Sequence, residues 1–192
     1  MTGKRQLQKA QTKEKITVSA LKMYSENGFS TPTIAIANDA QVSHGSIFVH
    51  FPTADDLLIY SIERFSEEIG NELRMLTGSD DIAELLGMHI DVLIRHEDLY
   101  KRLIKESVYL PKEARSTLIA IQSALSFHFM QALEKAIDNG NIKDVPFHMI
   151  FNTWLGLIQY YLMNGDLFAP DGSVLEQYKD SLIKYFLKLI EK

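Results

Sequence analysis

The stretch from Thr31 to Phe51 limits what this chain can fold into more than any other part. Its pattern predicts two short helices, over 33–40 and 44–50, with only a tight break between them. Pro52 ends the second helix, because the residue before a proline is pushed out of helical geometry. Two helices joined by so short a turn are typical of a helix-turn-helix, whose second helix lies in the DNA major groove.

Local residue choices support the first of these helices. Thr31 can cap it, and Pro32 suits its first position, where no backbone N–H is needed. Its core face is expected to carry Ile34, Ala37 and Ala40.

The second helix begins at a capping residue, Ser43. The small residues Gly45 and Ser46 allow this helix to sit deep in a groove. Ile47 and Phe48 lie on the side expected to return to the core.

A series of residues occurs here in a fixed order: Asn27-Gly28-Phe29, Ile36-Ala37, Ala40, Val42-Ser43, Gly45-Ser46-Ile47-Phe48, Phe51-Pro52 and Leu57-Leu58. Together they resemble the DNA-binding module of the TetR family of repressors, over roughly the first 60 residues. The resemblance implies a dimeric DNA-binding repressor.

Several positions depart from the family pattern. Gln41 stands where a turn glycine is usual, so a residue with a side chain must make the turn. Phe48 replaces a tyrosine and lacks its hydroxyl, and Ala54 replaces a lysine. Thr53 and Asp56 form a capping-box pattern there, which suits a helix start but does not attract DNA phosphate.

Charge is divided unevenly along the chain. The net charge is −5, but residues 1–50 carry +3 and residues 51–192 carry −8. Such asymmetry is typical of a protein that faces nucleic acid with its basic end. Phosphate neutralisation supplies most non-specific DNA affinity, so the charge agrees with the helix-turn-helix.

The composition is that of a globular protein of 192 residues, 46% hydrophobic and 23% charged. It contains no cysteine, which excludes disulfides and thiolate sites. The N-terminal residues do not resemble a signal peptide. The longest apolar segment, 145–163, carries several polar side chains and is predicted to be a buried helix rather than a membrane span. A cytoplasmic protein is expected.

The whole chain is predicted to be α-helical, because no segment shows the alternating pattern of a strand. About nine helices are expected, at 11–26, 33–40, 44–50, 54–76, 82–95, 98–109, 112–138, 146–163 and 174–190. Residues 1–53 are assigned to a DNA-binding domain and 54–192 to an effector-binding and dimerisation domain. Residues 1–10 are expected to form a flexible basic arm.

The DNA contact is expected to combine base edges and phosphates. His44 and Ser46 are placed at base edges, and His50 at a phosphate. The full set of expected DNA-binding residues is Lys9, Lys13, Lys15, Thr33, Ser43, His44, Gly45, Ser46 and His50.

The last two helices carry too much apolar surface for one buried face each, which predicts burial on more than one side. Either they lie centrally in a monomer core, or they also form a two-fold interface. The family resemblance implies the interface, and a two-fold dimer suits a palindromic operator. The residues assigned to it are Met149, Thr153, Gly156, Tyr160, Ile183, Leu187 and Ile190.

Aromatic and apolar residues of the second domain are candidates for an effector pocket, although each alone can equally be ordinary core. They are Met88, His89, Tyr100, Leu103, Phe127, His128, Phe129, Met130, Phe151, Asn152, Trp154, Ile158 and Gln159. No basic cluster accompanies them, so a neutral or cationic, largely apolar molecule is expected. It would act by a population shift that changes the spacing of the two recognition helices.

The motifs point to no catalytic residue, cofactor or metal site. His89 and His96 are seven residues apart, which is two helical turns and too far for one metal without help. There is no H-E-x-x-H pattern, no glycine-rich phosphate loop and no G-x-S-x-G serine. An enzyme is therefore not expected.

Two functions remain open. One is a ligand-responsive DNA-binding repressor, and the other is a small-molecule-binding helical dimer or enzyme that no longer uses its module. The missing lysine at Ala54 favours the second. The intact Gly45-Ser46-Ile47 and the basic first helix favour the first, which we prefer.

Overall fold

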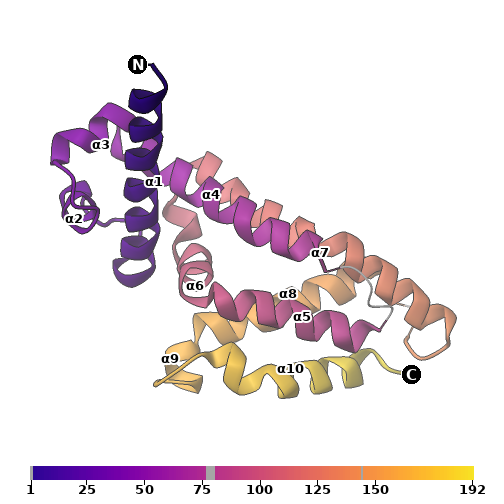
Figure 1. Ribbon diagram of the computed structural model, residues 1–192. Helices are drawn as coiled ribbons and strands as arrows, with labels where there is room; N and C mark the ends of the chain where they lie inside the picture. Colours follow the sequence, from indigo (N-terminus) through magenta and orange to yellow (C-terminus); the bar gives the residue numbers. More distant parts are fainter. Residues whose placement is uncertain (1, 77–80, 144) are drawn as a thin grey trace.

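The computed structural model describes residues 2–76, 81–143 and 145–192 (Figure 1). Its elements are α1 (Thr2–Asn27), α2 (Thr33–Asp39), α3 (His44–His50), α4 (Ala54–Arg74), α5 (Ile82–Arg95), α6 (Glu97–Glu106), the 3-10 helix η1 (Ser107–Tyr109), α7 (Lys112–Asp138), α8 (Phe147–Met163), α9 (Gly165–Phe168) and α10 (Val174–Ile190). The predicted all-α class is confirmed, because these residues form no strand beyond one isolated bridge between Ile142 and Glu191. The ten α-helices of the described residues exceed the expected nine because α9 has only four residues, too few for periodicity to detect. None of the described helices is long and apolar enough to cross a membrane.

Helices α1, α2 and α3 form a small bundle at one end of the molecule (Figure 1). Ile16, Ala20 and Tyr24 of α1 are buried together with Ile36 of α2 and Ile47 of α3. Fully burying an aliphatic side chain such as Ile47 stabilises a fold by roughly 1.5–3 kcal/mol. A few such residues are therefore enough to hold two helices of seven residues each against α1.

Residues 2–10, expected to form a flexible arm, are helical in the structure, because α1 already begins at Thr2. Residues 3–11 are exposed, so no core holds this part of the helix. It is rich in Lys, Arg and Gln, which have high helix propensity. Local propensity therefore extends the helix well beyond the part that packing supports.

The start of α2 differs in two details from the prediction. Thr31 does not cap the helix: its hydroxyl donates to the carbonyl of Gly28 at 2.6 Å, and Pro32 occupies the cap position. Ile34 is 48% exposed, and Ile36 takes the expected core position instead. So short a helix buries only the positions that face α1.

The turn between α2 and α3 is made by Gln41, which has a φ of 55°. This left-handed conformation costs a residue with a side chain about 1–2 kcal/mol. The turn is closed by the Val42 N–H, which donates to the carbonyl of Ala37 at 3.0 Å. Ser43 then caps α3 as predicted, accepting from the Ser46 N–H.

Helix α4 leaves the small bundle and lies beside α7 for much of its length (Figure 1). It starts at the predicted capping box of Thr53 and Asp56. Leu58, Ile62, Phe65, Ile69 and Leu73 form a buried apolar stripe along this helix. The helix ends at Arg74, and Thr77-Gly78-Ser79, expected to interrupt it, lie outside the described residues.

The helices that follow α4 pack around Trp154 of α8, which is fully buried. Its indole Nε1 donates to Nδ1 of His89 on α5 at 3.0 Å. The ring of Phe186 on α10 lies 5.0 Å away, centroid to centroid. Burial lowers the pKa of His89 to about 3, so its imidazole is neutral, as a nitrogen that accepts a hydrogen bond requires.

Candidate nucleic-acid interface

Helix α3 buries only Ile47 and turns its other side to solvent. Gly45 lies on this outer side. A Cβ atom placed on Gly45 would meet no atom within 4 Å, so the chain itself has room for a side chain there. The glycine instead keeps the outer face of the helix low, which suits close approach to a groove floor.

Polar groups at the start of α3 are already bonded to one another. Thr33 Oγ1 and His44 Nε2 are 2.9 Å apart, and the Ser43 and Ser46 hydroxyls are 2.6 Å apart. The first pair links the start of α2 to the start of α3. The structure thus brings four of the predicted DNA-binding residues together, where each can exchange its partner for a phosphate or a base edge.

A basic group lies at the other end of α3. Partial burial and the charges of Lys9 and Lys13 lower the pKa of His50, which places these three residues close together. The Lys13 ammonium lies 3.5 Å from the centre of the Tyr60 ring, a cation–π contact that fixes its side chain. Lys15 is exposed on α1.

Phe48 and Val49 are candidate contacts that the sequence analysis missed. Phe48, expected in the core, is 43% exposed and packs edge-on against His44, with ring centroids 5.2 Å apart. Val49 is 69% exposed. Residues one and two places after Ile47 point about 100° and 200° away from it on a helix. The exposure of Phe48 and Val49 could therefore have been predicted from the sequence. Apolar side chains at a major groove contact the thymine methyl group.

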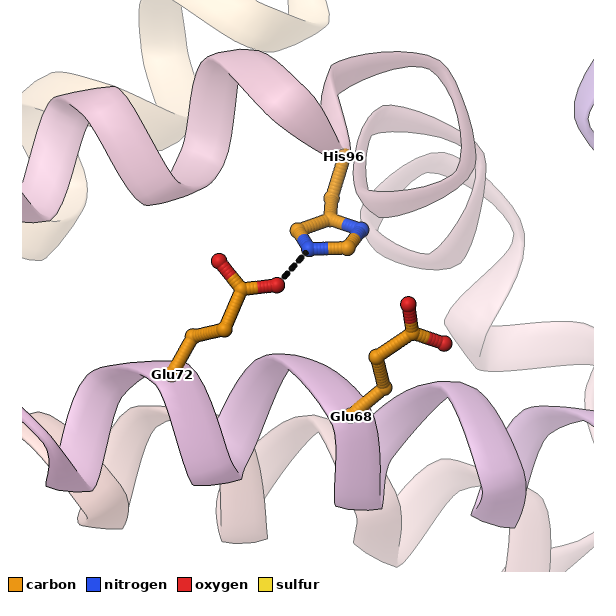
Figure 2. A group of neighbouring side chains, drawn as sticks. All are labelled: Glu68, Glu72 and His96. Carbon is orange, nitrogen blue, oxygen red and sulfur yellow. Dashed lines mark hydrogen bonds and ion pairs between the residues drawn. The ribbon is translucent and has the colours of Figure 1, made fainter.

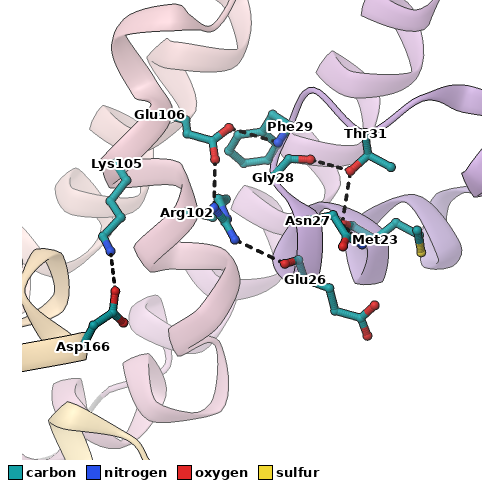
Figure 3. A network of polar contacts seen from close by, with 10 residues as sticks. All are labelled: Met23, Glu26, Asn27, Gly28, Phe29, Thr31, Arg102, Lys105, Glu106 and Asp166. Carbon is teal, nitrogen blue, oxygen red and sulfur yellow. Dashed lines mark hydrogen bonds and ion pairs between the residues drawn. The ribbon is translucent and has the colours of Figure 1, made fainter. Parts of the chain in front are cut away.

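A polar network ties α6 to the turn between α1 and α2 (Figure 3). Glu106 accepts from the backbone N–H of Phe29 at 3.0 Å and pairs with Arg102. Arg102 in turn donates to the carbonyl of Glu26 at 3.3 Å. A Cβ on Gly28, whose φ is 90°, would come within 2.8 Å of the Glu106 carboxylate. The network therefore needs glycine at this position. The sequence alone could not predict the network, because its partners lie so far apart along the chain.

A cavity of about 670 Å³ lies beside this network, between α1, α4 and the junction of α5 with α6. We call it the joint cavity. Its lining combines apolar side chains with both signs of charge: Leu21, Phe65, Ile94 and Leu99 with Glu68, Arg95, His96, Glu97, Asp98 and Lys101. Burial opposes ionisation of Glu72 at its edge, but hydrogen bonds from Arg95 and His96 outweigh this and lower the pKa of Glu72.

The residues expected around an effector do not enclose one space. Most belong to the packed core and are at most 8% exposed: His89, Tyr100, Leu103, Phe129, Phe151, Trp154 and Ile158. Met88, Met130 and Gln159 are half-buried, and Asn152 is exposed. Phe127 and His128 line a separate surface groove, where His128 bonds to the carbonyl of Arg74. The residues of the expected pocket are thus divided between the packed core, which their aromatic rings fill, and a surface groove.

The residues expected at a dimer interface divide by helix. On α8, Met149, Thr153, Gly156 and Tyr160 are all exposed. On α10, Ile190 is buried and Leu187 is half-buried within the chain. Ile183 faces α5, with Cδ1 3.8 Å from where Gly87 would carry a Cβ. The exposed apolar residues of α10 are instead Tyr185 and Leu189, 59% and 62% exposed.

Comparison with known proteins agrees with this architecture. Residues 16–60 match the family model of bacterial regulatory proteins, tetR family. No curated protein matches the chain. Many solved structures do, at low identity.

Three solved structures illustrate the likeness. The TetR family transcriptional regulator PfmR from Thermus thermophilus is 17% identical with a TM-score of 0.72, over 90% of this chain and 97% of that one. A TetR family regulator from Agrobacterium tumefaciens is 17% identical with a TM-score of 0.77, over 96% and 100%. A protein from Saccharomonospora viridis in complex with choline is 16% identical with a TM-score of 0.79, over 95% and 99%.

These likenesses show a shared fold over nearly the full length of each chain, and the family model covers the helix-turn-helix described above. Residues 16–60 of this chain are therefore similar to the helix-turn-helix module of the bacterial regulatory proteins of the tetR family, and the whole chain shares the fold of solved TetR family regulators.

Proposed function

We propose that the protein is a repressor that binds a palindromic operator as a homodimer in the cytoplasm and leaves it when a small molecule binds. The observation that carries this proposal is the outer face of α3, where open Gly45 is flanked by His44 and Ser46. These side chains, with Phe48, meet base edges in the major groove. Phosphate contacts come from Thr33, Ser43, His50, Lys9, Lys13 and Lys15.

The alternative is a helical small-molecule-binding dimer or enzyme that no longer uses its DNA-binding module. Its support was Ala54, which stands where the family has a lysine. Lys9 and Lys13 lie near His50, so α1 supplies positive charge on the same side of the module. This arrangement favours DNA binding over an unused module.

We infer that two chains pair through α8 and α10. Exposed apolar residues gather on their outer faces: Met149, Tyr160 and Met163 on α8, with Tyr185 and Leu189 on α10. Contiguous exposed apolar surface marks interaction sites in soluble proteins. Gly156 lies in the α8 face, and a Cβ there would meet nothing within 4 Å, which allows a second helix to approach. A two-fold axis here presents two α3 helices to successive major grooves.

The effector is proposed to bind in the joint cavity rather than in the aromatic core. This cavity touches α1 and the start of α6, so its contacts change whenever the DNA-binding domain shifts, as a population shift requires. Phe65 and Leu99 offer apolar surface, while Glu68 and Asp98 favour positive charge. The effector is therefore a small cation of mixed polarity, less apolar than the sequence suggested. The similar fold from Saccharomonospora viridis in complex with choline, a quaternary ammonium, agrees with this class.

The experiment that tests operator binding is a mobility shift with the DNA upstream of the protein's own gene. A specific complex that outcompetes random DNA and weakens as salt increases is expected, since phosphate contacts release counterions. Equal affinity for random and upstream DNA would contradict a specific repressor and favour the alternative function.

A further inference from the structure

Three side chains able to ligate a metal meet at the edge of the joint cavity. Glu68 and Glu72 project from α4, and His96 comes from the junction of α5 with α6 (Figure 2). One ligand atom from each lies within 4.8 Å of the other two. The two glutamates are one helical turn apart and so share a face. His96 reaches that face from the opposite side, with Nε2 2.7 Å from Oε1 of Glu72.

We propose that Glu68, Glu72 and His96 bind a divalent transition-metal ion of the zinc class. One imidazole nitrogen with two carboxylate oxygens is a ligand set that zinc accepts. Bonds of about 2.0–2.2 Å in a tetrahedral site place ligand atoms roughly 3.4 Å apart. Reaching that spacing needs Glu72 and His96 to move slightly apart from their 2.7 Å contact, and the Glu68 side chain, which is exposed on its helix, to rotate inward.

Two of the three ligands are already oriented. Arg95 holds Oε2 of Glu72 through Nε at 3.0 Å and Nη2 at 2.5 Å, which leaves Oε1 turned to His96. The His96 ring packs edge-on against Phe65, with centroids 5.7 Å apart. Partners of this kind fix the direction of metal ligands. A metal on Oε1 replaces the bond between Glu72 and His96 and leaves the Arg95 contact in place.

Glu68 is the ligand free to close the site. Apart from a Coulombic interaction with Arg64, its carboxylate makes no hydrogen bond or ion pair with the described residues. Two carboxylates against the single guanidinium of Arg95 leave the group with net negative charge. A cation entering the group therefore finds one fixed carboxylate, one fixed imidazole and one mobile carboxylate.

The fourth coordination position opens toward the joint cavity, because Glu68 and His96 both line it. Three protein ligands with one open position leave room for water or for a donor atom of a second molecule. The ion would tie α4 to the junction that leads into α6, next to the contacts of α6 with α1. That regulatory consequence rests on the proposed function, whereas metal binding itself does not.

In the sequence, the histidine nearest to His96 is His89, which lies too far away for the two to share one metal. The structure separates the two, since His89 is buried and bonded to Trp154. The ligands that His96 meets instead lie 24 and 28 residues earlier in the chain. Only the packing of the α5–α6 junction on α4 brings them together.

The test is a titration of the full chain with Zn²⁺ in competition with a chromogenic chelator, without DNA. One Zn²⁺ per chain is expected, together with the visible spectrum of tetrahedral Co²⁺ when cobalt is used. Glu68→Gln and His96→Gln should each weaken binding at least about 100-fold and abolish that spectrum. Glu67→Gln, exposed on the same helix, and His148→Gln, exposed on α8, are matched controls expected to bind as the wild type does.

A thermal melt of each metal-free variant shows whether it folds, and Glu68→Gln decides the matter if His96→Gln does not. Wild-type protein that binds no Zn²⁺ would overturn the proposal, as would equal binding by Glu68→Gln. Because the titration contains no DNA, its failure and a failure of operator binding are separate results.

Discussion

Glu106 accepts a hydrogen bond from the backbone N–H of Phe29 across 77 residues of sequence. This contact joins α6 to the turn that precedes the helix-turn-helix. Together with the bond from Arg102 to the Glu26 carbonyl, it gives the DNA-binding domain a second attachment besides α4. A displacement of α6 is therefore passed directly to the end of α1.

Replacing Glu106 with alanine should loosen this attachment. The Phe29 N–H loses its acceptor and Arg102 its ion pair, and a partly buried unpaired donor costs about 1–3 kcal/mol. We expect a lower free energy of unfolding in urea and faster amide exchange at Gly28 and Phe29. Glu134→Ala on the exposed side of α7 is the control. Identical exchange in both variants would show that the contact does not hold the turn in solution.

Substituting Gly45 should separate DNA binding from stability. Since a Cβ there meets nothing within 4 Å, Gly45→Ala should stabilise the chain by roughly 0.5–1 kcal/mol, the usual cost of glycine in a helix. The larger Gly45→Gln should lower operator affinity at least about tenfold, which is about 1.4 kcal/mol. Melting curves and operator titrations measure the two effects. Equal operator affinity of the wild type and both variants would show that Gly45 does not lie in the DNA interface.

A charge in the α8 face should break the proposed dimer. Tyr160→Asp places a carboxylate in the pairing surface, where an unpaired buried charge costs several kcal/mol. Tyr109→Asp on η1, where the tyrosine is 85% exposed, is the matched control. Light scattering should show a monomer for the first variant and a dimer for the second. A wild-type monomer at micromolar concentration would refute pairing through this face.

Acid should destabilise the protein through His89. Its pKa is about 3 when folded, against an ordinary value near 6.5, so the unfolded chain binds the extra proton below pH 6.5. The contribution of neutral His89 is complete above pH 6.5 and decreases as pH falls from 6.5 toward 3, by up to about 1.4 kcal/mol per unit. Urea unfolding between pH 7 and 5 should show a shallower slope for His89→Gln than for wild type or His148→Gln. Equal slopes in all three would mean that His89 titrates normally in the fold.

Features set by neighbouring residues could be predicted from the sequence. Ser43 caps α3, Thr53 and Asp56 form their capping box, and α7 spans 112–138 as expected. Each depends on contacts within one or two helical turns. The same locality explains the family resemblance, because the helix-turn-helix is built almost entirely from such signals.

Features set by packing between distant segments could not be predicted. Phe48 points outward because α3 has only one face against the bundle, which short-range spacing did not resolve. From the sequence alone, Ile183 and Trp154 could each belong to an interface, a pocket or the core, because their neighbours in space are not known. The contacts of Glu106 and His96 join helices far apart in the chain, and no residue pattern marks them in advance.

Helix α1 runs for almost four turns before its first buried residue, Ile16. Lys13, over the Tyr60 ring, and Glu14, paired with Arg64, already tie the turn before Ile16 to α4, so the part without support is residues 3–11, about 14 Å long at 1.5 Å per residue. An unsupported helix of this length is near the balance between helix and coil. Whether this segment stays helical then depends on what it contacts. When Lys4, Arg5 and Lys9 bind phosphate, the segment becomes ordered, and binding loses that part of its conformational entropy. Changing helix propensity in this segment would tune operator affinity while every residue that reads a base stays the same.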